Sequence, residues 1–237
     1  MDLIRIEQVT KNFGEINALR SVSLNVPSGC ILGLIGPNGA GKTTLLNTIN
    51  GVYKPDGGHI YFEDRDLSDL EVHEIAQLGI SRTFQIVRTF RRLSALENMF
   101  AASIYSKHES RLDLERAEDL LKFVGLLEKR DQYAYELSGG QQKLLEFARA
   151  LMPDPKTILM DEPFAGVHPE IKGQLRDNIR EMNKREKKTF IVVSHDMESI
   201  EDLCHRLVVL NIGAKLAEGE TKEVLSSKDV IDAYLGE

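Results

Sequence analysis

The sequence predicts an α/β fold: a mixed, largely parallel core sheet, an N-terminal antiparallel β layer and an inserted α-helical subdomain. Alternating apolar and polar side chains in the first 62 residues indicate half-buried strands. Helical periodicity dominates from about residue 90 to 150, and short apolar strands alternate with helices beyond it, as in parallel sheets. We expect one domain, 1–237, with approximately 1–88 and 151–237 in the core and 89–150 in the helical subdomain.

The N-terminal layer is predicted from two alternating segments. "LIRIEQV" (3–9) and "LRSVSLNV" (19–26) place apolar side chains mostly at every second position, as in a strand with one buried face. The turn "KPDGG" then leads into a short strand, "HIYF" (59–62). We expect these strands to form an antiparallel layer beside the next apolar strand.

The stretch "GPNGAGKTT" (36–44) lies between that strand, "ILGLI" (31–35), and a helix beginning at 42. It contains G-x-x-x-x-G-K-T, with Gly36, Gly41, Lys42 and Thr43 at the fixed positions. Glycines let the backbone curl so that successive N–H groups surround an anion, and the helix N-terminus strengthens the attraction. Lys42 would reach the β- and γ-phosphates, and Thr43 would hold Mg²⁺. The sequence therefore predicts a nucleoside triphosphate site.

Helical segments fill the middle of the chain. A helix over 69–78 and a strand over 80–85 precede a helix that begins at Ser94, which forms a capping box with Glu97. The next helix stops at Gly125. We expect one face of this helix to be buried, through Leu114, Ala117, Leu121 and Val124.

A second glycine-containing helix start occurs at "ELSGGQQ" (136–142). Ser138, Gly139 and Gly140 precede a helix, so N–H groups are again available to an anion. The alternative is an ordinary N-cap. Because the helical subdomain separates this stretch from the first anion site, we expect the two to share a nucleotide only across a dimer.

Acidic residues and a histidine follow buried strands in the C-terminal half. The run 156–160 ends at Asp161, where a phosphate-loop ATPase needs its second magnesium ligand, and at Glu162, which would polarise the attacking water. The alternative for this pair is a helix cap with an acidic first turn. His195 follows the strand 189–194, and taken alone it fits a structural role equally well. A charged helix over 170–188, without sustained heptads, and a strand pair at 206–210 and 215–219 complete the core.

Composition narrows the function. A net charge of −7 and a pI near 5.5 argue against a protein that binds nucleic acid by neutralising phosphates. Cys30 and Cys204 fit small buried side chains in a reducing compartment, and the scattered histidines indicate no zinc site. The N-terminus lacks the pattern of a signal peptide, and no apolar stretch is long enough to span a membrane. We expect a cytosolic protein that reaches a membrane by docking onto another protein.

Five motifs together resemble those of ATP-binding-cassette (ABC) ATPases: "GPNGAGKT", Gln85, "LSGGQ", "ILMDEP" and the "SH" at 194–195, in that order. The resemblance spans essentially the whole chain and implies the P-loop NTPase fold of these cassettes. It also implies that two copies pack head to tail around ATP. Each nucleotide would contact the phosphate loop of one copy (Gly36, Pro37, Asn38, Gly39, Ala40, Gly41, Lys42, Thr43 and Thr44) and Ser138, Gly139 and Gly140 of the other.

The same resemblance implies roles for single residues. Gln85 matches the glutamine that contacts Mg²⁺ and water, and Phe13 matches the aromatic residue that stacks on adenine. Asp161 matches the magnesium aspartate, Glu162 the catalytic glutamate and His195 the switch histidine. One position departs from the family pattern: "AGVHP" has His168 where Asp or Asn is usual. Communication between the two nucleotide sites is therefore the part of the mechanism that the resemblance supports least. With a histidine at this position, we expect that communication to depend on pH.

A finer resemblance indicates which process this ATPase drives. The segment "RTFQ" and the ending "VIDAYLGE" resemble cassettes of branched-chain amino-acid importers, with urea, amide and lipopolysaccharide cassettes as near relatives. We expect an ATPase on the inner face of the cell membrane, with separate permease subunits and a second cassette, identical or related. Residues 85–93 would help to form a groove for a permease helix, with Phe90 packed there and Arg88, Arg91 and Arg92 around it. The alternative is a soluble non-transport ABC ATPase acting on nucleic acid or the ribosome.

Overall fold

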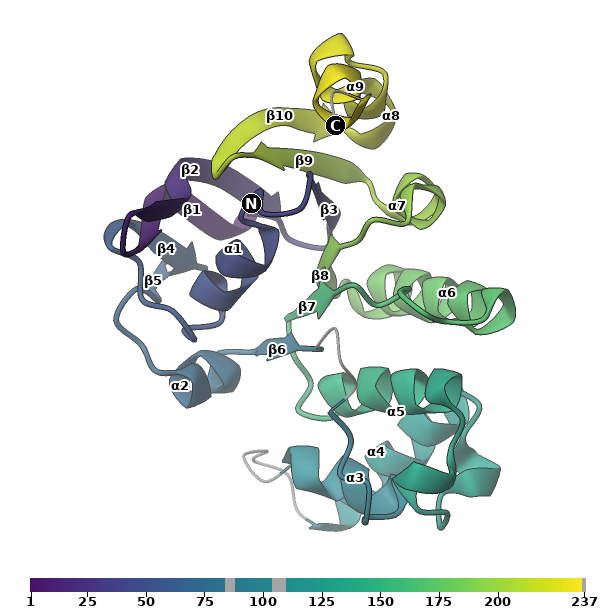
Figure 1. The fold of residues 1–237 in the computed structure, drawn as a ribbon. Coiled ribbons are helices and arrows are strands. Elements are labelled where there is room, and N and C mark those ends of the chain that lie inside the picture. Colours follow the sequence, from purple (N-terminus) through teal and green to yellow (C-terminus); the bar gives the residue numbers. More distant parts are fainter. Residues whose placement is uncertain (84–87, 104–109, 236–237) are drawn as a thin grey trace.

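Two β-sheets form the framework of the fold (Figure 1). The computed structural model describes residues 1–237 except 84–87, 104–109 and 236–237. The six-stranded core sheet has the order β10-β9-β3-β8-β7-β6, and its neighbours pair parallel except β10 with β9. Its strands are β3 (Ile31–Ile35), β6 (Ile80–Arg82), β7 (Thr157–Asp161), β8 (Thr189–Val193), β9 (Arg206–Asn211) and β10 (Ala214–Glu220). The predicted mixed, largely parallel sheet is confirmed.

The predicted antiparallel layer is also confirmed, with longer strands than expected. This four-stranded sheet has the order β2-β1-β4-β5. Its strands are β1 (Asp2–Phe13), β2 (Ile16–Pro27), β4 (Gly57–Phe62) and β5 (Arg65–Asp66). Pairing of β1 with β2 continues to Phe13 and Ile16 at a tight turn, through several register shifts. Local alternation breaks at such irregularities, so the pattern marked only the regular part of each strand.

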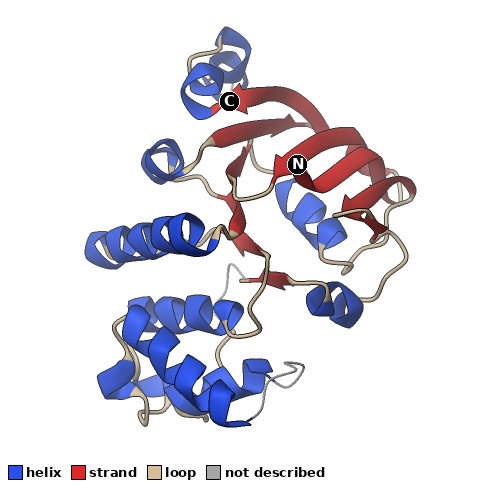
Figure 2. Cartoon of the chain, turned by 180° about the vertical axis from the view of Figure 1, so that it is seen from behind, coloured by secondary structure: helices blue, strands red, loops and turns tan. Residues whose placement is uncertain are grey.

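Helices cover both faces of the core sheet. They are α1 (Lys42–Ile49), α2 (Val72–Gln77), α3 (Ala95–Ser103), α4 (Ser110–Phe123), α5 (Gly139–Leu151), α6 (Pro169–Glu186), α7 (Met197–Leu203), α8 (Thr221–Leu225) and α9 (Lys228–Leu235), with 3₁₀ turns at Leu127–Lys129 and Ala134–Glu136. Helix α1 packs between the two sheets. Helices α3, α4 and α5 gather at one end of the core sheet, where the view from behind shows them as a group of helices (Figure 2).

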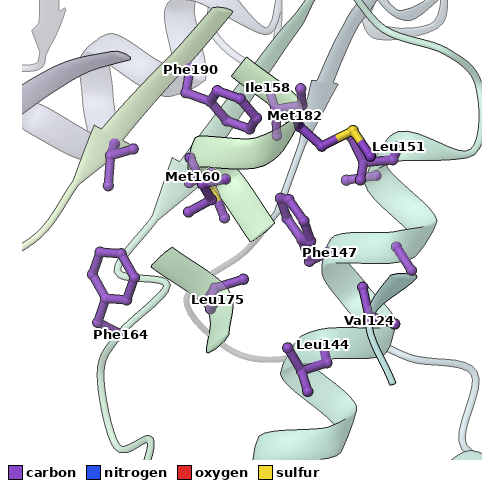
Figure 3. Packing of buried hydrophobic residues seen from close by; sticks show 14 of the residues in the cluster. Val124, Leu144, Phe147, Leu151, Ile158, Met160, Phe164, Leu175, Met182 and Phe190 are labelled. Atoms are coloured by element: carbon purple, nitrogen blue, oxygen red, sulfur yellow. The ribbon is translucent and has the colours of Figure 1, made fainter. Parts of the chain in front are cut away.

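The central strands are buried on both faces, which explains their continuous apolar sequence. Ile158 and Met160 of β7 pack with α5 and α6 in one cluster (Figure 3). Leu159 belongs to the other cluster, with residues of the antiparallel sheet and α1. Phe147 of α5 stacks on Phe190 of β8, with ring centroids 6.4 Å apart. This contact ties α5 to the core sheet.

Local signals in the helical region have mixed outcomes. The capping box is confirmed, because the Ser94 N–H donates to Glu97 Oε2 at 2.7 Å and the Glu97 N–H donates to Ser94 Oγ at 3.1 Å. The expected apolar face of α4 is wrong at Leu114, which is 39% exposed in the first turns of the helix, before the buried positions begin. The strand expected over 80–85 ends at Arg82 in the structure, and residues 84 and 85 lie outside the described part of the chain.

Cys30 and Cys204 are free thiols, and both are buried as predicted. Burial raises the pKa of Cys30 to about 11 and also raises the pKa of Cys204. In the described residues, we find no helix with both the length and the apolar character of a membrane span.

Candidate functional site

Most of the predicted site residues meet in one pocket of about 650 Å³. Ten of them line it: Asn38, Gly39, Ala40, Gly41, Lys42, Thr43, Thr44, Asp161, Glu162 and His195. The parallel register explains their meeting, because Leu34 of β3 and Asp161 of β7 both pair with Val193 of β8. The carboxyl ends of the three strands therefore open at the same edge of the sheet, where ligands bind in open α/β folds.

The phosphate loop depends on a close backbone approach at Gly36. This residue has φ +149°, and a Cβ there would lie 2.1 Å from the Leu210 carbonyl oxygen of β9. Helix α1 then begins at Lys42 without a side-chain cap, which leaves its first-turn N–H groups suited to an anion. Lys42 Nζ donates to the carbonyls of Gly36 at 2.6 Å and Pro37 at 2.9 Å. Gly36 and Pro37 thus do not line the pocket, and their carbonyl groups hold the Lys42 side chain.

Two oxygen atoms, one at the start of α1 and one at the end of β7, form a pair suited to a hard cation. Thr43 Oγ1 lies 3.4 Å from Asp161 Oδ1. Hydroxyl and carboxylate oxygens are the ligands that Mg²⁺ prefers. Asp161 Oδ2 accepts from Arg82 Nη2 at 3.2 Å, and Arg82 Nη1 donates to Asn47 Oδ1. The donor set therefore fits a magnesium ion beside bound phosphates.

Glu162 and His195 contact each other at the ends of neighbouring strands. Glu162 has the left-handed φ of +50°, which turns its side chain toward the end of β8. Glu162 Oε2 accepts from the backbone N–H of His195 at 3.2 Å and from Ser194 Oγ at 3.4 Å. Glu162 Oε1 lies 3.5 Å from His195 Nε2, whose side chain is 47% exposed. A buried carboxylate therefore stands beside an accessible imidazole at the pocket.

Other predicted contacts either do not line this pocket or lie outside the described residues. Phe13 is 42% exposed and packs edge-on against Tyr53, with centroids 5.0 Å apart, but it does not line the pocket. Ser138, Gly139 and Gly140 start α5, where Ser138 accepts from the Gln141 N–H, and they are also absent from the pocket lining. Gln85 lies outside the described residues. Their predicted roles therefore remain predictions.

The start of α6 is linked to the segment between β8 and α7. His168 precedes α6 and is exposed, and its side chain makes no cap hydrogen bond. One turn later, Lys172 forms an ion pair with Asp196, which caps α7 by accepting from the Ser199 N–H at 2.9 Å. Burial by itself would raise the pKa of Asp196, but the hydrogen bonds from Lys172 and Ser199 outweigh burial and lower it.

Comparison with known proteins identifies the family of this chain. Residues 19–165, more than half of the chain, match the family described as "ABC transporter". The chain belongs to the ABC transporter family. A probable branched-chain amino acid transport ATP-binding protein of Methanocaldococcus jannaschii is 38% identical over 255 residues, which cover 100% of this chain and 98% of the relative.

Solved ABC cassettes share the fold, which confirms the predicted fold class. An ATP-binding cassette of an ABC transporter in its ADP conformation matches with a TM-score of 0.92 at 38% identity, covering 100% of both chains. A dimeric cassette in a post-hydrolysis state with ADP and phosphate has a TM-score of 0.83 at 29% identity, covering 92% of this chain and 98% of that one. The ABC protein described here therefore binds nucleotide, and it hydrolyses ATP in transport.

The ABC motifs did not reveal the whole pocket wall. Further lining residues come from the β1–β2 turn and the start of β2, from the loop after β7, from the end of β8 and from the β9–β10 turn: Glu15, Ile16, Asn17, Ala18, Arg20, Ala165, Val193 and Ile212. Ile16 and Ile212 are 70% and 64% exposed. An apolar residue at a strand turn is a weak signal, because scattered exposed apolar side chains are common.

A second hollow of this ABC cassette, about 460 Å³, lies between the core and the helical region. Arg88 and Phe90 line it as expected, whereas Arg91 and Arg92 do not. The guanidinium of Arg149 lies 4.9 Å from the centre of the Phe90 ring. The other lining residues are Asn50, Val72, Ala76, Ile80, Ser81, Arg82, Ala102, Glu146, Ala150 and Pro153.

Proposed function

We propose that this ABC ATPase uses ATP and Mg²⁺ to power the import of branched-chain amino acids through separate membrane permeases. The observation that carries the ATPase chemistry is the pocket that unites Lys42, Thr43, Asp161, Glu162 and His195. The choice of solute is supported by the branched-chain amino acid transport name of the relative from Methanocaldococcus jannaschii.

Lys42, Thr43 and Asp161 bind the phosphates and the metal ion in the proposed reaction. Lys42 exchanges the carbonyls of Gly36 and Pro37 for the β- and γ-phosphates of ATP. Thr43 and Asp161 hold Mg²⁺, which neutralises phosphate charge when bound.

Glu162 orients the attacking water and accepts its proton. Its buried Oε1 accepts no hydrogen bond from the residues that the structure describes and lies 3.5 Å from His195 Nε2, so in this proposal the carboxylate turns toward the pocket that it lines to meet the water. His195 contacts the γ-phosphate from the exposed side of the pocket. Gln85 completes the magnesium and water contacts in this proposal.

A second cassette, identical or related, completes the nucleotide site. Ser138 and Gly139 are exposed at the start of α5, and they lie outside the pocket of their own chain. In the proposed dimer, Ser138, Gly139 and Gly140 close over the nucleotide of the partner, and Phe13 stacks on adenine. The dimeric cassette with ADP and phosphate supports this arrangement by analogy.

The hollow beside Phe90 is the proposed docking groove for a permease helix. Phe90 and Arg149 form an aromatic and cationic surface there, and Glu146 lines the same groove. In this proposal the ABC protein lies on the inner face of the membrane. Residues 1–88 and 151–237 form its core, and 89–150 form a helical subdomain that moves with the permease. His168 belongs to the contact between the two cassettes.

Reconstitution tests this function directly. The tagged chain is purified from detergent-solubilised native membranes, its companions are identified, and the complex is placed in proteoliposomes. We expect permease subunits and ATP-dependent uptake of leucine, with Lys42→Ala as the inactive control. Co-purification with ribosomes or nucleic acid, and ATPase stimulation by RNA, would overturn the transport proposal. Uptake of urea instead of leucine would overturn the choice of solute.

A further inference from the structure

Arg82 connects the nucleotide pocket to the groove beside Phe90. Its side chain is 5% exposed and forms an ion pair with Asp161, which is equally buried. Arg82 lines the groove, whereas Asp161 lines the nucleotide pocket. One guanidinium therefore contacts the aspartate of the cation site from the side of the groove.

The guanidinium holds two elements in a fixed relation. Nη2 donates to Asp161 Oδ2 of β7 at 3.2 Å, and Nη1 donates to Asn47 of α1. Thr43 lies one turn before Asn47 on the same helix, and its hydroxyl is 3.4 Å from Asp161 Oδ1. Arg82 thus bonds one oxygen of the carboxylate and leaves the other beside Thr43.

The ion pair between Arg82 and Asp161 is buried, and burying charged groups costs free energy. Burial lowers the pKa of Arg82, and the neighbouring Asp161 carboxylate acts in the opposite direction. A buried charge pair is weak as a source of stability, because removing both charges from water offsets most of their attraction. Groups that bond the outer oxygen of a metal ligand commonly set its orientation and the metal affinity.

We propose that Arg82 is a positioning residue that fixes Asp161 for metal binding in the nucleotide pocket. This inference rests on the magnesium site of the proposed function. Without Arg82, the carboxylate is free to turn away from Thr43, and part of the metal-binding free energy goes into ordering it again. Lysine keeps the charge but lacks the two-sided fork that reaches both Asp161 and Asn47.

The test measures metal affinity by electron paramagnetic resonance of free Mn²⁺, with the purified full chain and ADP. We expect Arg82→Met to raise the Mn²⁺ concentration at half-saturation by about tenfold, the lower end of the range for such outer-shell changes. The affinity for ADP without metal should change less than about twofold, because no ADP contact is assigned to Arg82. Arg82→Lys should fall between the wild type and Arg82→Met.

Two further variants separate positioning from general damage. In an Asp161→Asn background, Arg82→Met should cause no additional loss of Mn²⁺ affinity, because the carboxylate it positions is gone. Arg116→Met removes a guanidinium that bonds the Leu151 and Met152 carbonyls and lines neither cavity, and it should leave Mn²⁺ affinity unchanged. If Arg82→Met does not fold, Asn47→Ala removes the second anchor and should weaken Mn²⁺ binding in the same direction.

Unchanged or tighter Mn²⁺ binding in Arg82→Met would overturn the inference, because Arg82 would then not be needed to hold Asp161 in the metal-binding orientation. An equal loss in the Asp161→Asn background would overturn it as well. If the wild-type chain binds ADP with no dependence on Mn²⁺, the magnesium site of the proposed function fails first, and the two failures are distinguishable.

Discussion

Substituting Gly36 by alanine tests how closely the phosphate loop must approach β9. The added Cβ would lie 2.1 Å from the Leu210 carbonyl oxygen, which is backbone and unable to turn aside. Because real contacts of this kind stay beyond about 3 Å, the loop must move by roughly 1 Å. A displacement of that size at a reacting centre can reduce the rate by about a hundredfold. The φ of +149° adds conformational strain for any residue other than glycine.

Gly39 provides the matched control within the same loop. Its φ is +79°, but a Cβ there would meet no atom within 4 Å. Gly39→Ala should therefore cost about 1–2 kcal/mol of left-handed strain without displacing the loop. Urea denaturation without nucleotide measures the free energy of unfolding, and steady-state ATP hydrolysis measures kcat/KM.

We expect Gly36→Ala to lower kcat/KM at least about tenfold more than Gly39→Ala, because only the former moves the phosphate-binding N–H groups. Equal losses of kcat/KM in the two variants would refute the reasoning, since conformational strain alone would then explain both. Activity of Gly36→Ala within about threefold of the wild type would also contradict the required displacement.

Further predictions concern catalysis and stability. Glu162→Gln should retain ATP binding in a filter or calorimetric assay and lose turnover by about 10²-fold or more, and unchanged turnover would exclude Glu162 as the base. Lys172→Met should lower the free energy of unfolding by up to about 1 kcal/mol, whereas Asp196→Ala should cost about 1 kcal/mol more because the α7 cap is also lost; equal costs would contradict a cap contribution. Because the folded-state pKa of Asp196 is lowered, its stabilisation is present above the unfolded pKa of about 3.9 and lost as the pH falls through the lower folded-state pKa, so wild type and Asp196→Asn should converge in stability as the pH falls below about 4. Lys187→Gly, at the exposed C-cap of α6 with φ +55°, should raise the melting temperature by about 2–4 °C by removing left-handed strain, and a fall would contradict it.

The sequence allowed the central part of the site to be predicted because the motif positions coincide with strand ends. A parallel sheet brings the carboxyl ends of its strands together, so Lys42, Asp161 and His195 could be placed near one another before the structure was known. The polar bonds of Glu162 to the end of β8 follow from a left-handed backbone conformation, which the sequence pattern does not indicate.

Residues brought in by long-range pairing could not be predicted. Arg82 reaches Asp161 because β6 pairs with β7, although 79 residues separate the two side chains. Ile16 and Ile212 join the pocket from turns of separate sheets. Leu114 has helical spacing but lies before the buried part of α4. Local periodicity carries no information about which distant segments become neighbours.

The two buried thiols allow opening of the native protein to be measured by their rate of alkylation, without an added label. Cys30 lies at the start of β3 and Cys204 directly follows α7, so alkylation of either requires local or global opening of the core. Their raised pKa values keep the reactive thiolate scarce near neutral pH. Nucleotide binding to the closed form slows such opening by mass action. The rate of thiol alkylation with and without ATP therefore measures ligand binding on the unlabelled wild-type chain.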